Sequence, residues 1–304
     1  MEAYLFIDFG STYTKLTAVS AEEDVILATA KSYTTVETDV MEGFNKAYEA
    51  LLERLHQDIV FTKKLACSSA AGGLKIVSIG LVPELTMEAA KRAALGAGAR
   101  VTDVFSFQLN KGEIEKIKTS KADMILLAGG TNGGNTEVIL HNARMLKEGG
   151  IKIPIVVAGN KSCNDEIIAL FEGHMTYVIT ENVMPSLNNI NVEPARETIR
   201  SIFMENIVKA RGMSHVNDFI SEILMPTPAA VLKAARVLGE GTKDEEGIGD
   251  LVVIDIGGAT TDVHSICEGA PSKPSVVLRG LEEPLAKRTV EGDLGMRYSA
   301  LSLH

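Results

Sequence analysis

Residues 3–20 read AYLFIDFGSTYTKLTAVS, and this stretch decides how the chain begins to fold. The apolar runs Tyr4–Ile7 and Leu16–Val19 flank a glycine turn, a pattern that predicts two strands joined as a hairpin. The turn combines the carboxylate of Asp8 with a glycine, several hydroxyl side chains and a lysine. Backbone amides and hydroxyls bind phosphate oxygens, and a carboxylate holds hydrated Mg²⁺, so the turn suits a nucleotide phosphate chain. Taken alone, it is equally typical of an ordinary polar hairpin.

Length and composition limit the classes of protein to consider. A chain of 304 residues favours two domains, and its 45% hydrophobic and 23% charged residues are typical of a soluble α/β protein. A net charge of −10 with scattered Lys and Arg argues against nucleic acid as a partner. Cys67, Cys163 and Cys267 stand far apart, as in a protein of the reducing cytoplasm. We expect no signal peptide, because MEAYLFIDFG has no basic n-region and an aspartate inside its apolar run. We expect no membrane partner, because no apolar run approaches about 18 residues.

Apolar periodicity and turn signals predict the remaining elements. The expected strands are residues 25–31, 64–67, 74–82, 101–109, 124–129, 153–158 and 177–180. The expected helices are residues 40–56, 86–95, 111–118, 136–147, 164–171, 193–209 and 227–238. The strand, helix and strand within residues 122–158 predict a right-handed parallel crossover. The polar, glycine-rich run 239–249 predicts a loop.

The opening pattern returns in residues 251–266, LVVIDIGGATTDVHSI. Asp255 ends an apolar strand as Asp8 does. In both copies a glycine stands two residues after the aspartate and a threonine six residues after it. The seventh residue is charged, Lys15 in the first copy and Asp262 in the second. One such turn is weak support for a phosphate site, but two copies predict two related domains whose turns bind one phosphate chain between them.

The pair of turns resembles the two phosphate motifs of the actin-like ATPase superfamily of sugar kinases, heat-shock chaperones and actins. More narrowly, the chain from Ala3 to about Ala300 resembles the MutL/GlmL family, accessory proteins of adenosylcobalamin-dependent glutamate mutase. The motifs that carry this resemblance are FIDFGSTYTK, SSAAGGLKIVSIGLVPELT, AGGTNGGN, VVAGN, VVIDIGGATTDVHS and EGDLGMRYSA. The resemblance implies an α/β, actin-like ATPase fold (ribonuclease H-like) with mixed sheets flanked by helices.

The resemblance also implies a domain organisation. Residues 1–67 and 121–248 are expected to form the first actin-like domain with interdomain helices. Residues 68–120 are expected to be an inserted β-α-β unit. Residues 249–304 are expected to begin a second domain that is incomplete, because the superfamily's adenosine-binding Gly-Gly motif is not found after Met296.

The implied activity is that of an ATP-dependent, chaperone-like reactivase, which releases inactivated cobalamin from a mutase or aminomutase. Its cofactors would be ATP and Mg²⁺. Asp8 and Asp255 would organise the metal and take part in catalysis. The residues expected to bind the phosphates are Gly10, Ser11, Thr12, Tyr13, Lys15, Gly257, Gly258, Thr260 and Thr261.

Other interpretations stay open at this point. A small-molecule kinase on the same fold would need a base between the two motifs, and a nucleotide-dependent scaffold would need none. The loop Ala128–Asn135 and Asn160 follow predicted strands and could line the cleft, although tight packing also explains them. His264 alternates along a strand and is expected to pack or to face solvent. Pairing of the chain with a second copy as a homodimer is also open at this point.

Overall fold

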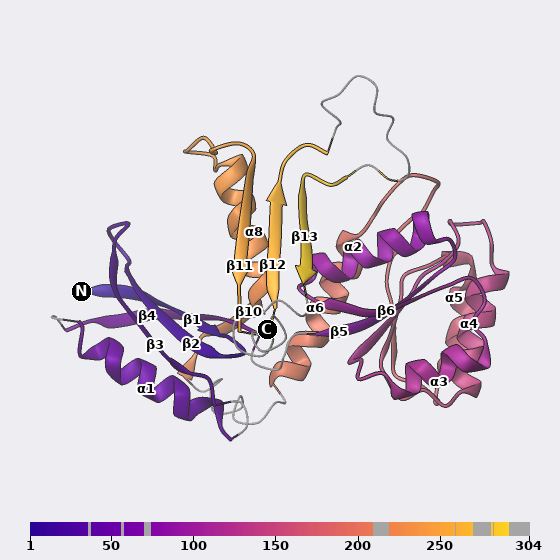
Figure 1. The fold of residues 1–304 in the computed structure, drawn as a ribbon, viewed down its shortest axis with the longest axis horizontal. Coiled ribbons are helices and arrows are strands. Elements are labelled where there is room, and N and C mark those ends of the chain that lie inside the picture. Colours follow the sequence, from indigo (N-terminus) through magenta and orange to yellow (C-terminus); the bar gives the residue numbers. More distant parts are fainter. Residues whose placement is uncertain are drawn as a thin grey trace, which may run out of the picture. The chain divides into compact units, whose positions relative to one another are not determined.

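The computed structural model describes residues 1–35, 38–55, 58–69, 74–208, 219–258, 260–269, 281 and 283–291. Three sheets with parallel and antiparallel pairs, together with helices, make this an α/β fold with mixed sheets (Figure 1). The chain divides into two compact units. The first unit comprises Met1–Gly73, Ile202–Ile266 and Arg288–His304, and the second comprises Leu74–Ser201 and Cys267–Lys287.

The first unit contains a five-stranded sheet of order β10-β4-β1-β2-β3. Its strands are β1 (Glu2–Phe9), β2 (Tyr13–Ser20), β3 (Ile26–Tyr33), β4 (Val60–Ser68) and β10 (Glu222–Pro226). The first three strands are antiparallel, whereas β4 pairs in parallel with both β1 and β10. If the five strands of this sheet are numbered in chain order, their order from β3 to β10 is 3-2-1-4-5. This is the ribonuclease H-like arrangement that the family resemblance implies.

Helix α1 (Val40–Leu52) packs on one face of this sheet. Alternate residues of β1 are buried on that face, namely Ala3, Leu5, Ile7 and Phe9. The ring of Phe44 lies 5.9 Å from that of Phe9. The helix begins where the side chain of Asp39 accepts a hydrogen bond from the Met41 amide at 2.8 Å. A side chain at Gly43 would place its Cβ 2.3 Å from the Tyr33 carbonyl oxygen, so glycine permits the close approach of α1 to β3.

The first unit also contains β11 (Leu251–Ile256) and β12 (Thr261–Ile266), which form the second hairpin, and β12 also pairs with β13 (Ala286–Glu291). Helix α8 (Thr227–Glu240) covers one face of this sheet, where a Cβ on Gly239 would contact Leu251 and Ile266. The opposite face carries exposed apolar side chains from β11: Val252, Ile254 and Ile256.

The second unit contains a parallel sheet of order β6-β5-β7-β8-β9. Its strands are β5 (Lys75–Gly80), β6 (Arg100–Ser106), β7 (Met124–Leu127), β8 (Ile155–Val157) and β9 (Tyr177–Ile179). Counted in chain order this is 2-1-3-4-5, the flavodoxin-like form of the doubly wound fold. The parallel pairing of β7 with β8 agrees with the crossover predicted for residues 122–158.

Helices cover the sheet of the second unit. They are α2 (Glu88–Gly96), α3 (Lys111–Thr119), α4 (Glu137–Glu148) and α5 (Asn164–Phe171), and α6 (Glu193–Val208) follows them in the chain. Figure 1 shows α2 on one side of β5 and β6 and α3 on the other. The apolar core between the sheet and α3–α5 includes Val77, Ile79, Ile125, Leu127, Ile139, Leu146, Ile167 and Phe171. Burial of these side chains stabilises the unit.

Several element boundaries differ from the sequence predictions. The helix predicted at 40–56 ends at Leu52, while His56 lies outside the described residues. The helix predicted from Thr86 starts earlier, as one π-helical turn at Pro83–Met87, and continues as α2. Proline supplies the first turn because its missing N–H would have no helical partner there. The hydroxyl of Thr86 accepts hydrogen bonds from the Leu81 and Val82 amides.

The sheet pairing bears on the expected domain boundaries. Within residues 68–120, β5 and β6 pair in parallel, and α2 lies between them in the chain. That unit is continuous with β7–β9 through the pairing of β5 with β7, so the sheet joins it to residues 124–179. The predicted boundaries between actin-like domains stay a prediction. Residues 70–73 and residues 292–300 of the EGDLGMRYSA motif lie outside the described residues.

Candidate functional site

The first turn joins β1 to β2 and places two opposite charges side by side. Asp8 on β1 lies directly across from Lys15 on β2. The Gly10 amide donates to the Tyr13 carbonyl at 3.0 Å and closes the turn. The Lys15 ammonium lies 3.2 Å from Oδ2 of Asp8. Since the lysine is well exposed, this pair contributes little to stability, and its charge remains accessible to a ligand.

The second turn, between β11 and β12, repeats this geometry. Asp255 lies across from Asp262, as Asp8 lies across from Lys15. The Gly257 amide donates to the Thr260 carbonyl at 2.9 Å, which closes the turn in the same way as in the first hairpin. The duplication in sequence is therefore a duplication of backbone structure, with both aspartates at the same register position.

The two turns meet within the first unit. A Cβ on Gly258 would lie 2.0 Å from Oγ1 of Thr12 and 3.0 Å from its Cβ, so glycine is required for this approach. Thr12 is 6% exposed, and its hydroxyl has no hydrogen-bond partner among the described residues. A buried hydroxyl of this kind fits an anionic ligand, because an unsatisfied polar group is costly and a phosphate oxygen would accept its hydrogen bond.

Comparison with known proteins places this pair of turns in a family. Residues 4–304 match the family described as MutL protein. Protein MutL of Clostridium tetanomorphum is 68% identical over 305 residues, which cover 100% of this chain and 66% of the relative. The chain belongs to the MutL family. It therefore spans 66% of the length of the curated relative that it matches.

A comparison of structures returned an activator of 2-hydroxyisocaproyl-CoA dehydratase from Clostridium difficile, solved with bound ADPNP. The match covers 73% of this MutL-family chain and 99% of the activator, with 11% sequence identity and a TM-score of 0.20. A likeness this weak carries no argument about the site.

The charged residue after each turn differs in its environment. Lys15 is exposed, whereas Asp262 is 5% exposed and bound to Arg288, itself 6% exposed. The Arg288 guanidinium donates to Oδ1 of Asp262 at 2.8 Å through Nε, and its Nη2 lies 2.6 Å from the same oxygen. The Thr260 hydroxyl donates to Oδ2 at 3.3 Å. Burial lowers the pKa of Arg288, and Asp262 opposes that shift. These contacts of Asp262 with Arg288 and Thr260 stabilise the second turn.

The electrostatics of Asp255 depend on both turns. Burial raises the pKa of Asp255; nearby Asp262 and Asp8 also raise it, whereas Lys15 and Arg288 lower it. The two site aspartates are thus close enough to interact, as one shared cation between them would require. A Mg²⁺ ion commonly uses one or two carboxylates together with water and phosphate oxygens. No cluster of three or more metal-binding side chains occurs in the described part of the chain.

Thr227 is a site residue that the sequence analysis did not identify. Its hydroxyl, at the first turn of α8, donates to Oδ1 of Asp8 at 2.8 Å. Cys67, at the end of β4, places its Sγ 3.6 Å from the same oxygen. Burial, with a further contribution from Asp8, raises the pKa of Cys67 to about 12, so it is a neutral thiol here. The carboxyl ends of neighbouring parallel strands lie at one edge of a sheet, which is why Cys67 and Thr227 lie beside Asp8. The sequence could have indicated these two residues only if β1, β4 and β10 were known to be neighbours.

A cavity of about 290 Å³ lies beside Asp8 on the same face of the sheet. Besides Asp8, Lys15, Thr17 and Cys67, its lining is apolar and includes Phe6, Leu65, Met225 and Ala230. Asp8 and Lys15 are therefore accessible from this cavity, and the hydrogen bond from Thr227 limits the freedom of the Asp8 carboxylate.

Two of the predicted ligands have other contacts. The ring of Tyr13 stacks on Tyr33 at 4.7 Å between centroids, with the Lys31 ammonium 5.4 Å from its centre. Thr261 lies next to Asp262 on β12, so its side chain points to the opposite face of the sheet. The structure thus brings together Asp8, Lys15, Thr12, Asp255, Gly258 and Thr260, with Gly10, Ser11 and Gly257 in the same turns.

The glycine-rich loop 128–135 in the second unit is held by asparagine side chains. Asn160, fully buried, accepts from the Gly133 amide and donates to the carbonyls of Gly134 and Asn135. Asn182 donates to the Gly130 carbonyl at 2.9 Å. These groups are satisfied within the protein, which supports the packing interpretation of the loop. His264 is also fully buried, as expected for a packing residue. None of the helices in the described ranges meets the length and hydropathy needed to cross a bilayer.

Proposed function

We propose that this MutL-family chain supplies the phosphate-binding turns of an ATP-dependent reactivating protein for an adenosylcobalamin-dependent mutase. The observation that carries the proposal is the pair of equivalent hairpins whose aspartates occupy the same register position and whose turns touch at Thr12 and Gly258. Membership of the MutL family supports the mutase as the client, through the resemblance described above.

Each residue has a distinct role in the proposal. Asp8 and Asp255 hold Mg²⁺ through its waters, and the backbone and hydroxyls of the two turns bind phosphate oxygens. Bound Mg²⁺ would neutralise phosphate charge. Lys15 adds a positive charge at the open side of the first turn. A protein contributes to phosphoryl transfer to water mainly by positioning the reactants and neutralising charge. The proposed mechanism therefore requires no dedicated base.

The test uses the full-length protein, since the chain spans 66% of its relative. ATP turnover is measured alone and with a mutase that carries inactivated cobalamin. We expect stimulation by the inactivated mutase and loss of turnover in Asp8→Ala and Asp255→Ala variants that remain folded by circular dichroism. Phosphate transfer to a small molecule would instead indicate a kinase, and ATP-dependent sedimentation a scaffold. Unchanged turnover in either aspartate variant would refute the site.

A further inference from the structure

The second unit contains a hollow with no role in the proposed phosphate site. It has a volume of about 440 Å³, within the range of pockets that bind small molecules. Its lining comes from the last turn of α4, from the loop before β8, and from α5 with the loop before β9. The residues are Arg144, Lys147, Glu148, Gly150, Ile151, Lys152, Leu170, His174 and Met175.

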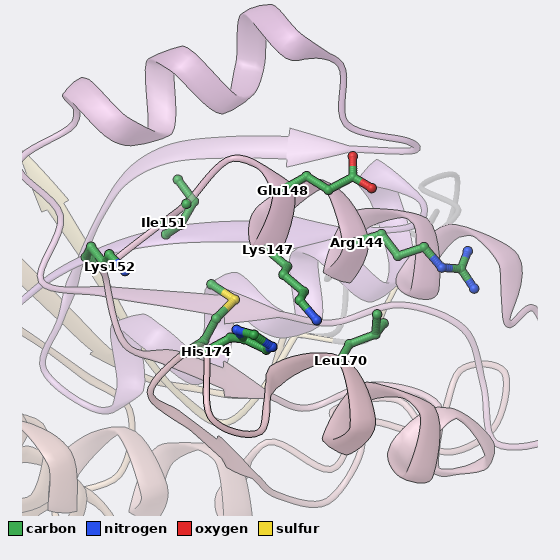
Figure 2. A pocket seen from close by; sticks show the side chains of 9 residues that line it. Arg144, Lys147, Glu148, Ile151, Lys152, Leu170 and His174 are labelled. Atoms are coloured by element: carbon green, nitrogen blue, oxygen red, sulfur yellow. The ribbon is translucent and has the colours of Figure 1, made fainter.

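The charge of this hollow is opposite to that of the whole chain. The chain has 40 acidic and 30 basic residues, yet the lining carries Arg144, Lys147, Lys152 and His174 against one carboxylate. In Figure 2 the Lys147 ammonium and the His174 ring extend into the same space near Leu170, whereas the Glu148 carboxylate points away from them. The hollow is therefore electropositive.

The basic side chains are only partly neutralised by their neighbours. Arg144 lies 3.8 Å from Glu166, a long and exposed pair. Neither Lys147 nor Lys152 lies within ion-pair distance of a carboxylate in the ranges that the structure describes. A lysine in the last turn of a helix complements the helix dipole, which accounts for Lys147. It does not account for Lys152, which lies beyond the helix in the loop.

The floor of the hollow is apolar. Ile151 is 2% exposed, and Leu170 and Met175 are half-buried. An apolar floor beneath basic groups matches the usual composition of a small-molecule site, in which a few polar groups orient a ligand whose body contacts apolar side chains. Lysines bind carboxylate and phosphate oxygens through charge-assisted hydrogen bonds.

We propose that this hollow is a binding site for a small organic anion, an apolar group joined to a carboxylate or a phosphate. Lys147 and His174 bind the anionic group, Lys152 adds positive charge at the other end of the hollow, and Ile151, Leu170 and Met175 contact the apolar group (Figure 2). All of its residues belong to the second unit, whereas the proposed phosphate-binding turns belong to the first.

The test is a methyl NMR titration of the 304-residue chain with phenyl phosphate, benzoate and inorganic phosphate, and with benzyl alcohol as the neutral analogue. We expect saturable shifts of the Ile151, Leu170 and Met175 methyl signals with phenyl phosphate or benzoate. The probe that binds with the higher affinity shows whether the site prefers a phosphate or a carboxylate. Binding should weaken at higher salt, since the groups are near the surface.

Matched variants assign the effect to the lysines. We expect Lys147→Gln with Lys152→Gln to weaken binding about tenfold. Lys147→Arg with Lys152→Arg should retain binding, and the exposed Lys91→Gln on α2 should leave it unchanged. The proposal is overturned by equal shifts with benzyl alcohol, by equal affinity in the double glutamine variant, or by no shift at about 10 mM, a weaker affinity than specific sites show.

Discussion

At the scale of the residue, the two carboxylate oxygens of Asp8 have partners of different kinds. Lys15 contacts one carboxylate oxygen from the exposed side of the hairpin, and Thr227 donates to the other from the start of α8. A surface ion pair is weak, whereas a half-buried hydroxyl donating to a charged oxygen is stronger. Thr227 is thus the main determinant of the orientation of Asp8, acting as a positioning residue.

We expect Thr227→Val to weaken Mg-ATP binding by the full-length protein about tenfold, because the carboxylate loses its fixed orientation. The free energy of unfolding should fall by about 1 kcal/mol. Thr227→Ser retains the hydroxyl and should behave as the wild type. Calorimetry with and without Mg²⁺ measures the effect, and equal Mg-ATP affinity in the valine variant would show that Thr227 does not position Asp8.

His264 makes stability depend on pH. It is fully buried on β12, and burial lowers its pKa to about 4, with Arg288 adding to the shift and Asp262 opposing it. The ordinary histidine pKa is about 6.5, so between these values the unfolded chain binds more protons than the folded chain. The contribution of neutral His264 is fully present above pH 6.5 and is lost progressively as pH falls toward 4.

We expect the urea midpoint of the wild type to fall between pH 7 and pH 5 by more than that of His264→Leu. The difference follows because leucine has no proton to bind when the chain unfolds. Exposed His174→Leu is the control that also removes one histidine, and it should keep the wild-type pH dependence. A His264→Leu variant as acid-sensitive as the wild type would contradict this explanation.

At the scale of the element, the two hairpins share backbone geometry but not surroundings. The face of β1 that points away from Asp8 is buried under α1. The corresponding face of β11 exposes Val252, Ile254 and Ile256, each about 60% exposed. An uncovered apolar strand face favours association with other chains.

We therefore expect Val252→Thr combined with Ile254→Thr to reduce self-association of the 304-residue chain in analytical ultracentrifugation. Its unfolding free energy should change by less than about 0.5 kcal/mol, as for other exposed positions. Val253→Thr is the matched control, because Val253 lies across from buried His264 on the face that α8 covers. That substitution should destabilise the chain without changing association. A large loss of unfolding free energy in the double variant would show that the β11 face carrying Val252 and Ile254 is covered.

At the scale of the whole molecule, the second unit has a complete sheet of its own. Among the strands that the structure describes, β5–β9 pair only with one another, and the buried cluster between them and α3–α5 consists of residues from 77 to 171. A hydrophobic core of its own, with few contacts to the rest of the chain, is typical of a domain that folds independently.

We expect residues 74–201, expressed alone, to unfold cooperatively in urea with α/β circular dichroism. The matched fragment 1–73 should not fold, because β10 of its sheet lies beyond residue 201. A fragment 74–201 without a cooperative transition would show that the second unit depends on the rest of the chain.

Most elements and both aspartate turns were predictable from sequence because their signals are local, whereas strands β10 and β13 were not predicted. The apolar runs of β1 and β11 and the glycine two residues after each aspartate depend on neighbours in the chain. The sequence also indicated the family, which the match over residues 4–304 shows. The start of the helix was misplaced because Thr86, predicted as the residue that caps it, lies inside the π-helical turn Pro83–Met87.

Sequence by itself thus determined the fold class, the two hairpins and the candidate aspartates. Only the tertiary structure decided that the turns touch at Thr12 and Gly258, that Thr227 holds Asp8, and that Arg288 holds Asp262. It likewise decided that β5 and β6 continue the sheet of β7–β9. The physical reason is that local patterns encode each strand and turn, whereas contacts between distant residues arise only when the strands pair and the helices pack.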